Sequence, residues 1–495
     1  TEPDGAVTTT TYGNGRVSTT DARGLVTDRT YDGYRQLVQV GERTATPQTP
    51  TVSYDLLGRR VAVVDARGNL TTTSYDPLGR RIQTSDPDLG TWQYAYDDAG
   101  RLTSQTDARG VVIETSYDDL GRPLVRRHGA TTLVAFTYDE VSAGAANIGR
   151  LTSFTDPTGS TQRTYDAAGR LRAETKTIGA DTYQLDWSFD VAGRVTALRY
   201  PELGGAREEV TQTYDASGRV IGVGEYLTGA TYDARGNLTA ATYGNGATVT
   251  RSYSSTRGWM MGQAVTVGGV ARDQFAVTRS PAGDVTARTS SVTPRDAWAF
   301  TYDGLGRLTA ADNTVDDTLD EAFTYDALGD RLTARRGAVT TAYQYPTAGA
   351  ARPHAPTTIG GLPVRYDANG NRLGIGLSVD ASYDANNRLV DDGTTSYAYD
   401  AEGRRVRAGT TVFVRDLVEV DGGTATRFYY LGDERVARRD QAGAVAYYHG
   451  DPIGTVRALT AADGSIAGAR LAFAFGELAA STGLADAFGI AGQRR

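Results

Sequence analysis

The chain contains no cysteine, so neither disulfide bonds nor thiolate metal ligands can contribute to its structure. It also lacks a run of about twenty apolar residues, the length that a membrane-spanning helix requires. Its 51 basic and 59 acidic residues are mixed along the sequence without a basic block, which argues against nucleic acid as the main partner.

Large aliphatic residues are scarce as well. Leu, Ile, Val and Phe make up roughly a fifth of the chain, a level that would suggest disorder if it came with a high net charge. The net charge is only −8 over 495 residues, and 29 tyrosines at regular positions add apolar area, so we expect an ordered protein. The sequence does not begin with Met and has no signal-like start, and we expect it to be a trimmed piece of something longer.

A tyrosine-aspartate pair recurs along the chain, usually followed three residues later by glycine and arginine. Four consecutive copies begin at Tyr54, Tyr75, Tyr96 and Tyr117, each 21 residues after the last. A fixed period of this length indicates a repeat architecture, in which neighbouring units stack without one central core.

Eight copies keep all four signature residues, and we take these positions as structural. They are Tyr54, Asp55, Gly58, Arg59; Tyr75, Asp76, Gly79, Arg80; Tyr96, Asp97, Gly100, Arg101; Tyr117, Asp118, Gly121, Arg122; Tyr165, Asp166, Gly169, Arg170; Tyr214, Asp215, Gly218, Arg219; Tyr302, Asp303, Gly306, Arg307; and Tyr399, Asp400, Gly403, Arg404. Other copies drift: Asn237, Asp330 and Asn371 stand where the arginine would be.

One period contains two strands and two turns. The run from Gly100 to Thr106 is rich in strand-tolerant residues, Asp107-Ala108-Arg109-Gly110 interrupts it, and a second run extends from Val111 to Tyr117. Aspartate opens each turn as a hydrogen-bond acceptor, and glycine closes it where a positive φ is often required. The pattern predicts an all-β protein of tandem antiparallel hairpins.

Alternation within strands gives one polar face and one thinly apolar face, which favours a single sheet wrapped around a cavity over a packed sandwich. The stretch from Arg251 to Ala299 is the least regular, and we expect a loop-rich interruption there. A parallel β-solenoid stays open as a competing fold. A propeller is less favoured because we find no doubled period.

Two kinds of contact between repeats are expected. Tyrosine rings should stack across neighbouring strands, each pair contributing about 0.2–1 kcal/mol. Each Gly-Arg arginine should pair with an aspartate of the adjacent repeat, a surface-type ion pair that contributes about 0–1 kcal/mol.

The block from Tyr96 to Thr103 resembles the repeat signature of the bacterial Rhs/YD-repeat family, which is related to the teneurins of animals. More than ten copies agree with it. The stretch from Tyr447 to Thr460, with the segments 472–477 and 489–495, resembles the start of the Rhs-associated core region. We therefore divide the chain into a repeat region, residues 1–411, and a truncated core-like region, residues 412–495.

The resemblance implies one long antiparallel sheet that spirals into a hollow β-shell. In Rhs and toxin-complex proteins such a shell holds a toxin, which an aspartyl self-cleaving site releases inside the cavity; in teneurins the shell is extracellular and adhesive. It implies that the partner is a toxin or effector polypeptide absent from this chain, with other segments of the parent protein as further partners, and that the protein is secreted or at the cell surface.

No group of residues in the sequence indicates a catalytic or metal site. Asp156-Pro157-Thr158-Gly159 and Asp451-Pro452-Ile453-Gly454 begin like the family's cleavage motif but lack its second aspartate, and each fits a tight turn better. The only histidines are His128, His354 and His449, with no metal-ligand spacing; His449 fits a packed structural residue. We expect no catalytic residue, cofactor or metal, although a glycosidase pair among the many carboxylates stays open.

These observations favour a structural function, a shell segment that encloses or scaffolds a C-terminal toxin. The alternative is an exported, wall-associated or adhesive repeat protein that binds carbohydrate, since tyrosine and tryptophan can stack on sugars. An enzyme is the least favoured class.

Overall fold

The structure, a computed structural model, describes residues 5–44, 49–451 and 454–483. In these residues it contains 46 β-strands, no α-helix and one short 3-10 helix, Asp317–Leu319. No helix in the described part of the chain is both long and apolar enough to cross a membrane. The all-β prediction is therefore confirmed.

Strands β1 to β34 form one sheet of 34 strands. Their bounds are β1 Thr9–Gly13, β2 Arg16–Thr20, β3 Val26–Tyr31, β4 Leu37–Glu42, β5 Thr51–Tyr54, β6 Arg60–Val64, β7 Leu70–Tyr75, β8 Arg81–Asp86, β9 Gly90–Tyr96, β10 Leu102–Thr106, β11 Val112–Tyr117, β12 Pro123–His128, β13 Thr131–Tyr138, β14 Leu151–Asp156, β15 Gly159–Tyr165, β16 Leu171–Ile178, β17 Asp181–Phe189, β18 Val195–Arg199, β19 Glu209–Tyr214, β20 Val220–Val223, β21 Leu227–Tyr232, β22 Leu238–Tyr243, β23 Ala247–Tyr253, β24 Met260–Val267, β25 Val270–Arg279, β26 Val285–Thr289, β27 Trp298–Tyr302, β28 Leu308–Asn313, β29 Glu321–Tyr325, β30 Arg331–Arg336, β31 Val339–Gln344, β32 Thr358–Ile359, β33 Leu362–Tyr366 and β34 Arg372–Ile375.

Two smaller sheets follow. The first pairs β35 Ser382–Tyr383 with β36 Leu389–Asp391. The second has ten strands: β37 Tyr397–Tyr399, β38 Arg405–Ala408, β39 Thr411–Val414, β40 Val418–Asp421, β41 Thr424–Leu431, β42 Glu434–Asp440, β43 Val445–Gly450, β44 Val456–Ala461, β45 Ile466–Ala472 and β46 Leu478–Thr482. This sheet runs without a break across the expected boundary between residues 411 and 412. The core-like residues 452–453 and 484–495 lie outside the described residues.

Within each sheet every strand pairs antiparallel with the strand that follows it, as in β7 with β8 and β8 with β9. All pairings of the described strands have this direction, so the chain is a meander of hairpins. The parallel solenoid is therefore excluded, because its rungs would pair in parallel.

A β-bulge accompanies the tyrosine at the end of each repeat. Ser74 faces Gln83 whereas Tyr75 faces Arg81, so one residue of β8 is skipped, and the same shift occurs at Tyr54 and Tyr117. A bulge bends its strand and increases the local twist. Because the bulge recurs at the same place in successive repeats, its effect accumulates and the sheet curves around a central space.

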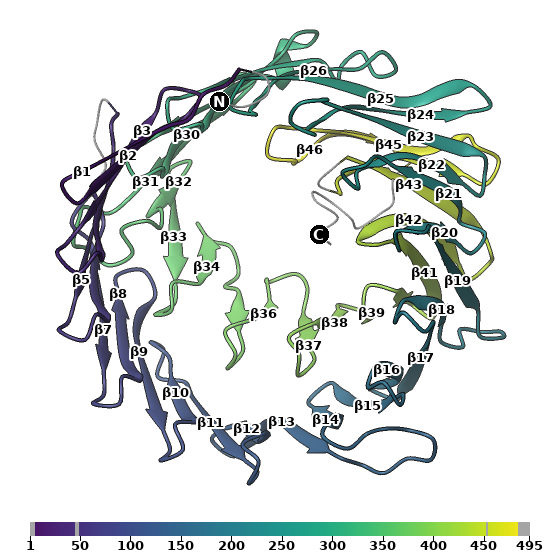
Figure 1. The fold of residues 1–495 in the computed structure, drawn as a ribbon, viewed down its shortest axis with the longest axis horizontal. Coiled ribbons are helices and arrows are strands. Elements are labelled where there is room, and N and C mark those ends of the chain that lie inside the picture. The colour runs from purple at the N-terminus through teal and green to yellow at the C-terminus, as the bar shows by residue number, and fades with distance from the viewer. Residues whose placement is uncertain (1–4, 45–48, 452–453, 484–495) are drawn as a thin grey trace.

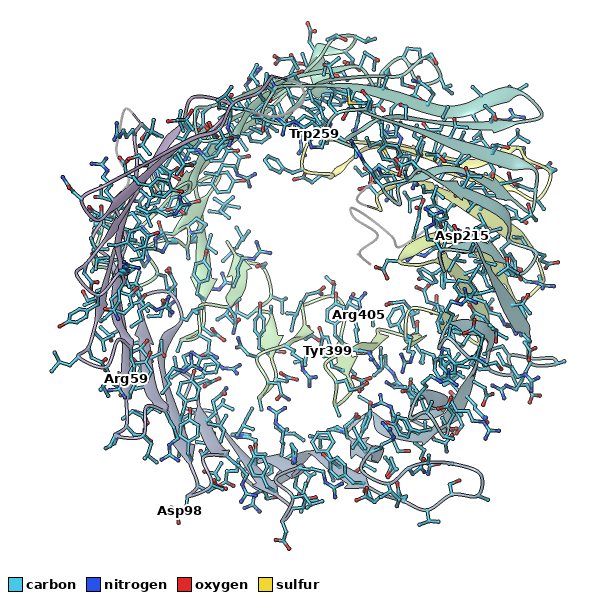
Figure 2. The ribbon with its side chains drawn as sticks, in the orientation of Figure 1. Arg59, Asp98, Asp215, Trp259, Tyr399 and Arg405 are labelled. Atoms are coloured by element: carbon cyan, nitrogen blue, oxygen red, sulfur yellow. The ribbon has the colours of Figure 1, made fainter. Side chains whose placement is uncertain are left out.

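The sheet follows a ring and then continues as a spiral (Figure 1). We call strands β1–β25 the first circuit and β26–β43 the second circuit; β44–β46 then pack against the start of the second circuit, where Leu471 joins Trp298 and Leu319. Figure 2 shows that the side chains leave the middle of the ring open.

The spiral tightens toward its end. Hydrogen-bonded partners on adjacent circuits are 261 residues apart at Arg23 and Asp284, 228 apart at Tyr200 and Phe428, and 153 apart at Glu321 and Ala474. The separation first rises to 289 residues at Asp65 and His354 and then falls along the last part of the chain.

Two sequence expectations need correction here. The stretch from Arg251 to Ala299 is not loop-rich, because it contains β24 and β25, strands of 8 and 10 residues. The wall is also not a thin single sheet throughout. Where β16–β24 face β38–β43, the two circuits form a sandwich around a core that includes Leu185, Leu227 and Val418. That core was invisible in the sequence because its halves are far apart in the chain.

Candidate functional site: the repeat wall and its seam

Each Tyr-Asp loop is a compact hydrogen-bonded unit. Asp76 Oδ1 accepts the backbone N–H groups of Leu78, at 3.0 Å, and Arg80, at 2.9 Å, while its Oδ2 accepts Arg80 Nε at 2.6 Å. Gly79 closes the loop with a φ of 84°, a region that L-residues rarely adopt. One carboxylate thus organises the loop, as the sequence predicted.

The arginine of each loop also connects two repeats. Arg80 Nη1 donates to the carbonyl oxygen of Asp97 at 2.8 Å, and its guanidinium carbon lies 5.0 Å from the ring centroid of Tyr96. The Tyr96 hydroxyl donates back to the carbonyl of Arg81 at 2.9 Å. We call this set of contacts the ladder. The arginine of one repeat donates to the aspartate carbonyl of the next repeat and lies against its tyrosine ring, and that tyrosine donates a hydrogen bond back to the first repeat.

This geometry corrects two predicted contacts. The loop arginine pairs with the aspartate of its own loop, at 2.6–2.7 Å in Asp55–Arg59, Asp97–Arg101, Asp118–Arg122, Asp166–Arg170, Asp190–Arg194, Asp215–Arg219, Asp303–Arg307 and Asp384–Arg388. Arg122 reaches the adjacent repeat's carboxylate as well, with Asp139 Oδ2 at 2.9 Å. The motif tyrosines receive a guanidinium rather than another tyrosine ring, a contact that contributes about 0.5–1 kcal/mol when exposed.

The pKa values of several loop carboxylates are lowered, which favours their charged form. At Asp215 the backbone N–H of Arg219 and then the Arg219 side chain lower the pKa of the carboxyl below its ordinary value. Asn237 and Asn371 replace arginine at two loops and keep part of this arrangement, since each amide donates to Oδ2 of its loop aspartate at 2.8 Å. The asparagine side chain is shorter than that of arginine, but its hydrogen bond to the aspartate still closes the loop.

A second class of arginine joins the circuits. Three periods carry an Asp-Ala-Arg-Gly turn at the hairpin end opposite the Tyr-Asp loop, at residues 21–24, 65–68 and 107–110. Arg109 Nη2 donates to the carbonyl of Asp384 at 3.0 Å, and Asn369 Nδ2 donates to Asp107 Oδ2 at 2.7 Å. Arg23 reaches Asp284 at 3.4 Å, and Arg67 contacts Asp326. We call this line of contacts the seam.

In the seam, turns of the first circuit meet Tyr-Asp loops of the second. Sequence reasoning had treated Asp107 to Gly110 only as a hairpin turn. Its recurrence as Asp21-Ala22-Arg23-Gly24 and Asp65-Ala66-Arg67-Gly68 was the available signal, because an arginine repeated in a turn needs an acceptor.

His354 lies in the seam between two carboxylates. Its Nδ1 is 2.6 Å from Asp88 Oδ2 and its Nε2 is 3.0 Å from Asp65 Oδ2. Burial acts to lower the pKa of His354, but the hydrogen bond and charge of Asp88, together with Asp330 and Asp65, raise it above the ordinary value. The protonated ring can donate to both carboxylates at once.

At the loop that begins with Asp400, a contact of the seam replaces the ion pair between the loop aspartate and the loop arginine. Arg404 turns away from Asp400 to Glu402, and Lys176 of the first circuit takes its place against the Asp400 carboxylate. Both side chains are buried, and Lys176 is the only lysine of the 495 residues. The pair joins β16 to the second circuit.

The other residues that the sequence offered as catalytic or metal-binding candidates make contacts that fit a structural role. His449 Nε2 is 2.9 Å from Thr460 Oγ1, and burial lowers the pKa of its ring to about 4. His128 ends β12. Asp156 Oδ1 accepts from Thr158 in a two-residue hairpin turn, and Asp451 accepts the backbone N–H of Gly454 at 2.9 Å. In residues 5–44, 49–451 and 454–483 no group of three His, Asp or Glu side chains is arranged to hold a metal ion.

The fold and the ladder define a YD-repeat shell wall, and comparison with known families agrees. The family model described as Teneurin YD-shell matches residues 144–360, and the RHS Repeat model matches residues 54–91, 90–112 and 96–133. Together they match more than half of the chain, which belongs to the Rhs/YD-repeat family. No curated protein matches the sequence.

Solved structures with a similar fold come from toxin complexes. The crystal structure of TcdB2-TccC3 is 14% identical, with a TM-score of 0.85 over 99% of this chain and 31% of that chain. A Tc holotoxin pore of Photorhabdus luminescens is 14% identical, with a TM-score of 0.88 over 100% of this chain and 30% of that chain. The chain thus spans less than a third of these relatives, and at this identity the likeness concerns the fold alone.

Proposed function

We propose that this chain is a wall segment of a shell that encloses or scaffolds a toxin or effector polypeptide, which is not part of this chain. The observation that carries the proposal is the curved wall around an open middle, with its two circuits joined by the contacts of the seam (Figure 2). Lys176, Asp107 and His354 join the two circuits. A protein that only presented its outer surface to a partner would not need such contacts.

The exposed edge of the first circuit supports a second partner, another segment of the same parent protein. Leu57, Leu78 and Leu120, at the tips of Tyr-Asp loops, are 73%, 75% and 77% exposed. Loops of the second circuit instead contact turns of the first, as Asp326 does with Arg67 and Asp384 with Arg109. Figure 2 shows Asp98 at the outer edge of the ring and Tyr399 nearer its centre. A periodic apolar row of this kind favours a docking edge.

We infer further that the parent protein is exported, that residues 1–411 and 412–495 correspond to its repeat and core-like regions, and that the chain has no catalytic role. The alternative of carbohydrate binding stays a prediction. A glycan array without hits would remove it.

Limited proteolysis of the natural parent protein tests the enclosure. We expect the polypeptide that follows this chain to survive proteinase K in the intact protein and to be cut once the seam is weakened by Arg109→Ala with Asn369→Ala. Arg60→Ala, on an exposed strand position, is the matched control. Equal digestion in the intact protein and the seam variant would refute enclosure.

A further inference from the structure

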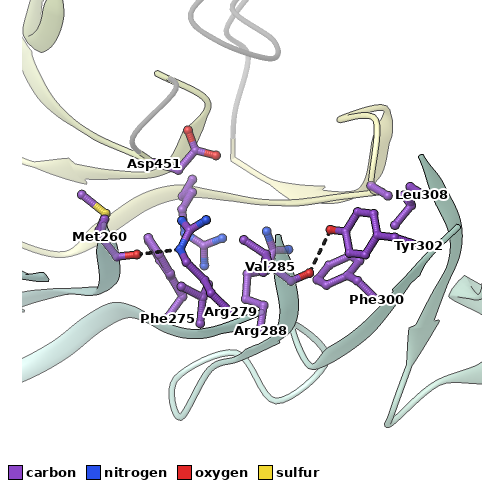
Figure 3. Close-up of a pocket in the computed structure, with 12 residues that line it drawn as sticks. Met260, Phe275, Arg279, Val285, Arg288, Phe300, Tyr302, Leu308 and Asp451 are labelled. Atoms are coloured by element: carbon purple, nitrogen blue, oxygen red, sulfur yellow. Dashed lines mark hydrogen bonds between the residues drawn. The ribbon is translucent and has the colours of Figure 1, made fainter. Parts of the chain in front are cut away.

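A pocket of about 310 Å³ is lined on one side by residues of β24–β28 and on the other by Asp451, by Arg457 of β44 and by Ala474 (Figure 3). Its wall is mostly apolar. The apolar side chains are those of Met260, Phe275, Val277, Val285, Phe300 and Leu308. The volume is at the lower end of the range for small-molecule sites and suits a molecule with one ring.

Three guanidinium groups line the same pocket. The Arg457 guanidinium forms ion pairs with Asp273, at 3.0 Å, and with Asp296, at 2.8 Å. Arg288 also contacts Asp296. The charges of Asp273 and Asp296 thus compensate those of Arg288 and Arg457.

Arg279 has donor capacity that the described residues do not use. Within the described part of the chain it donates only to carbonyl oxygens, those of Met260 at 3.3 Å and Gly283 at 2.8 Å, and makes no ion pair. Arg288 adds a second positive charge to the lining, but its Nε–H is buried and not accessible from the pocket. Burial, together with the charge of Arg457, lowers the pKa of Arg288 below its ordinary value, a cost that an added anion would offset.

Figure 3 shows Arg279 and Arg288 between Met260 on one side and Phe300 on the other, with Asp451 across from them. Among the described residues that line the pocket, Asp451 is the single carboxylate, and its Oδ1 accepts the backbone N–H of Thr455 at 2.8 Å. We propose that this pocket binds a small apolar carboxylate, with its ring against Phe275 and Phe300 and its carboxylate on Arg279. Charge-assisted bonds to arginine are roughly twice as strong as neutral ones. The proposal does not depend on enclosure of a toxin.

Calorimetry on the full chain tests this with 3-phenylpropionate and its amide as probes. We expect the acid to bind about tenfold more tightly than the amide, about 1.4 kcal/mol. Arg279→Leu should remove that preference, Val285→Trp should abolish binding by filling the pocket, and Arg60→Leu, away from the pocket, should change neither. Failure of both probes to bind, or equal binding of acid and amide, would overturn the proposal.

Two sources could supply such a ligand, a free metabolite or the end of a polypeptide. The peptide Ala-Ala-Phe, as free acid and as amide, separates them. Binding of the peptide acid but not its amide supports a chain terminus, whereas binding of phenylpropionate alone supports a small molecule.

Discussion

The rings of Tyr226 and Tyr429 stack with 3.5 Å between their centroids, although the two residues belong to different circuits of the spiral. Both hydroxyls donate to Glu208, Tyr226 at 2.5 Å to Oε1 and Tyr429 at 2.8 Å to Oε2. Burial raises the pKa of Tyr226 above its ordinary value, so its proton stays available to Glu208. Neither residue belongs to a Tyr-Asp pair, so this stacking joins the two circuits and differs from the stacking between neighbouring repeats that the sequence predicted.

Tyr429 should be among the most sensitive positions of the wall. Tyr429→Ala opens a cavity between two packed sheets, and we expect a loss of about 3–5 kcal/mol in the free energy of unfolding. Tyr429→Phe keeps the ring contact and should cost only about 1 kcal/mol. Urea denaturation measures both. Tyr12→Ala, at a well-exposed position, should change little, and equal effects at both positions would contradict the packed core between the circuits.

The ladder arginine should matter more for its geometry than for its charge. Arg80→Lys keeps the positive charge but cannot contact Asp76, the Asp97 carbonyl and the Tyr96 ring together. We expect faster hydrogen exchange in the loop from Asp97 to Gly100, with a loss of about 1–2 kcal/mol of local stability. Unchanged exchange in Arg80→Lys would mean that charge alone suffices.

The loop glycine tests the backbone argument. Gly79→Ala places a Cβ on a residue with a φ of 84°, which costs about 1–2 kcal/mol. Gly33→Ala is a matched control because Gly33 lies in a similar loop, has no positive φ and faces open space. Thermal unfolding should show a lower Tm for the first variant only; equal shifts would remove the backbone explanation.

The buried pair Lys176–Asp400 should be costly to break on one side. Lys176→Met leaves an unpaired buried carboxylate, and we expect a loss of about 3–5 kcal/mol. Replacing both residues, Lys176→Met with Asp400→Asn, should recover part of it, because the uncharged asparagine oxygen can still accept the backbone N–H groups of Glu402 and Arg404. Lys176 also provides a label-based test, since an amine-reactive ester followed by mass spectrometry should modify it only when the circuits separate. Rapid labelling of the native protein would contradict its burial.

The seam should weaken as the solution becomes alkaline. The folded pKa of His354 is raised, so its contribution is fully present below the unfolded value of about 6.5 and is lost as pH rises through the folded value. Hydrogen exchange of residues 349–354 at a series of pH values should show this loss. His354→Gln should remove the pH dependence in that window, and an unchanged profile in the variant would assign it to another group.

The sequence by itself determined the local structure. Asp76 and Gly79 specify their loop through contacts within five residues, and the strand from Val112 to Tyr117 follows from alternation, so hairpins could be predicted. The family signature was also readable, since its residues recur at a fixed offset.

Only the tertiary structure decided which repeats meet. The partners of Arg109, His354 and Lys176 lie more than 200 residues away, and their register depends on the radius of the ring. That radius follows from small bends at every bulge, summed over many strands. No local pattern encodes such a sum, which is why the seam, the core between circuits and the pocket beside Arg279 could not be predicted from the sequence.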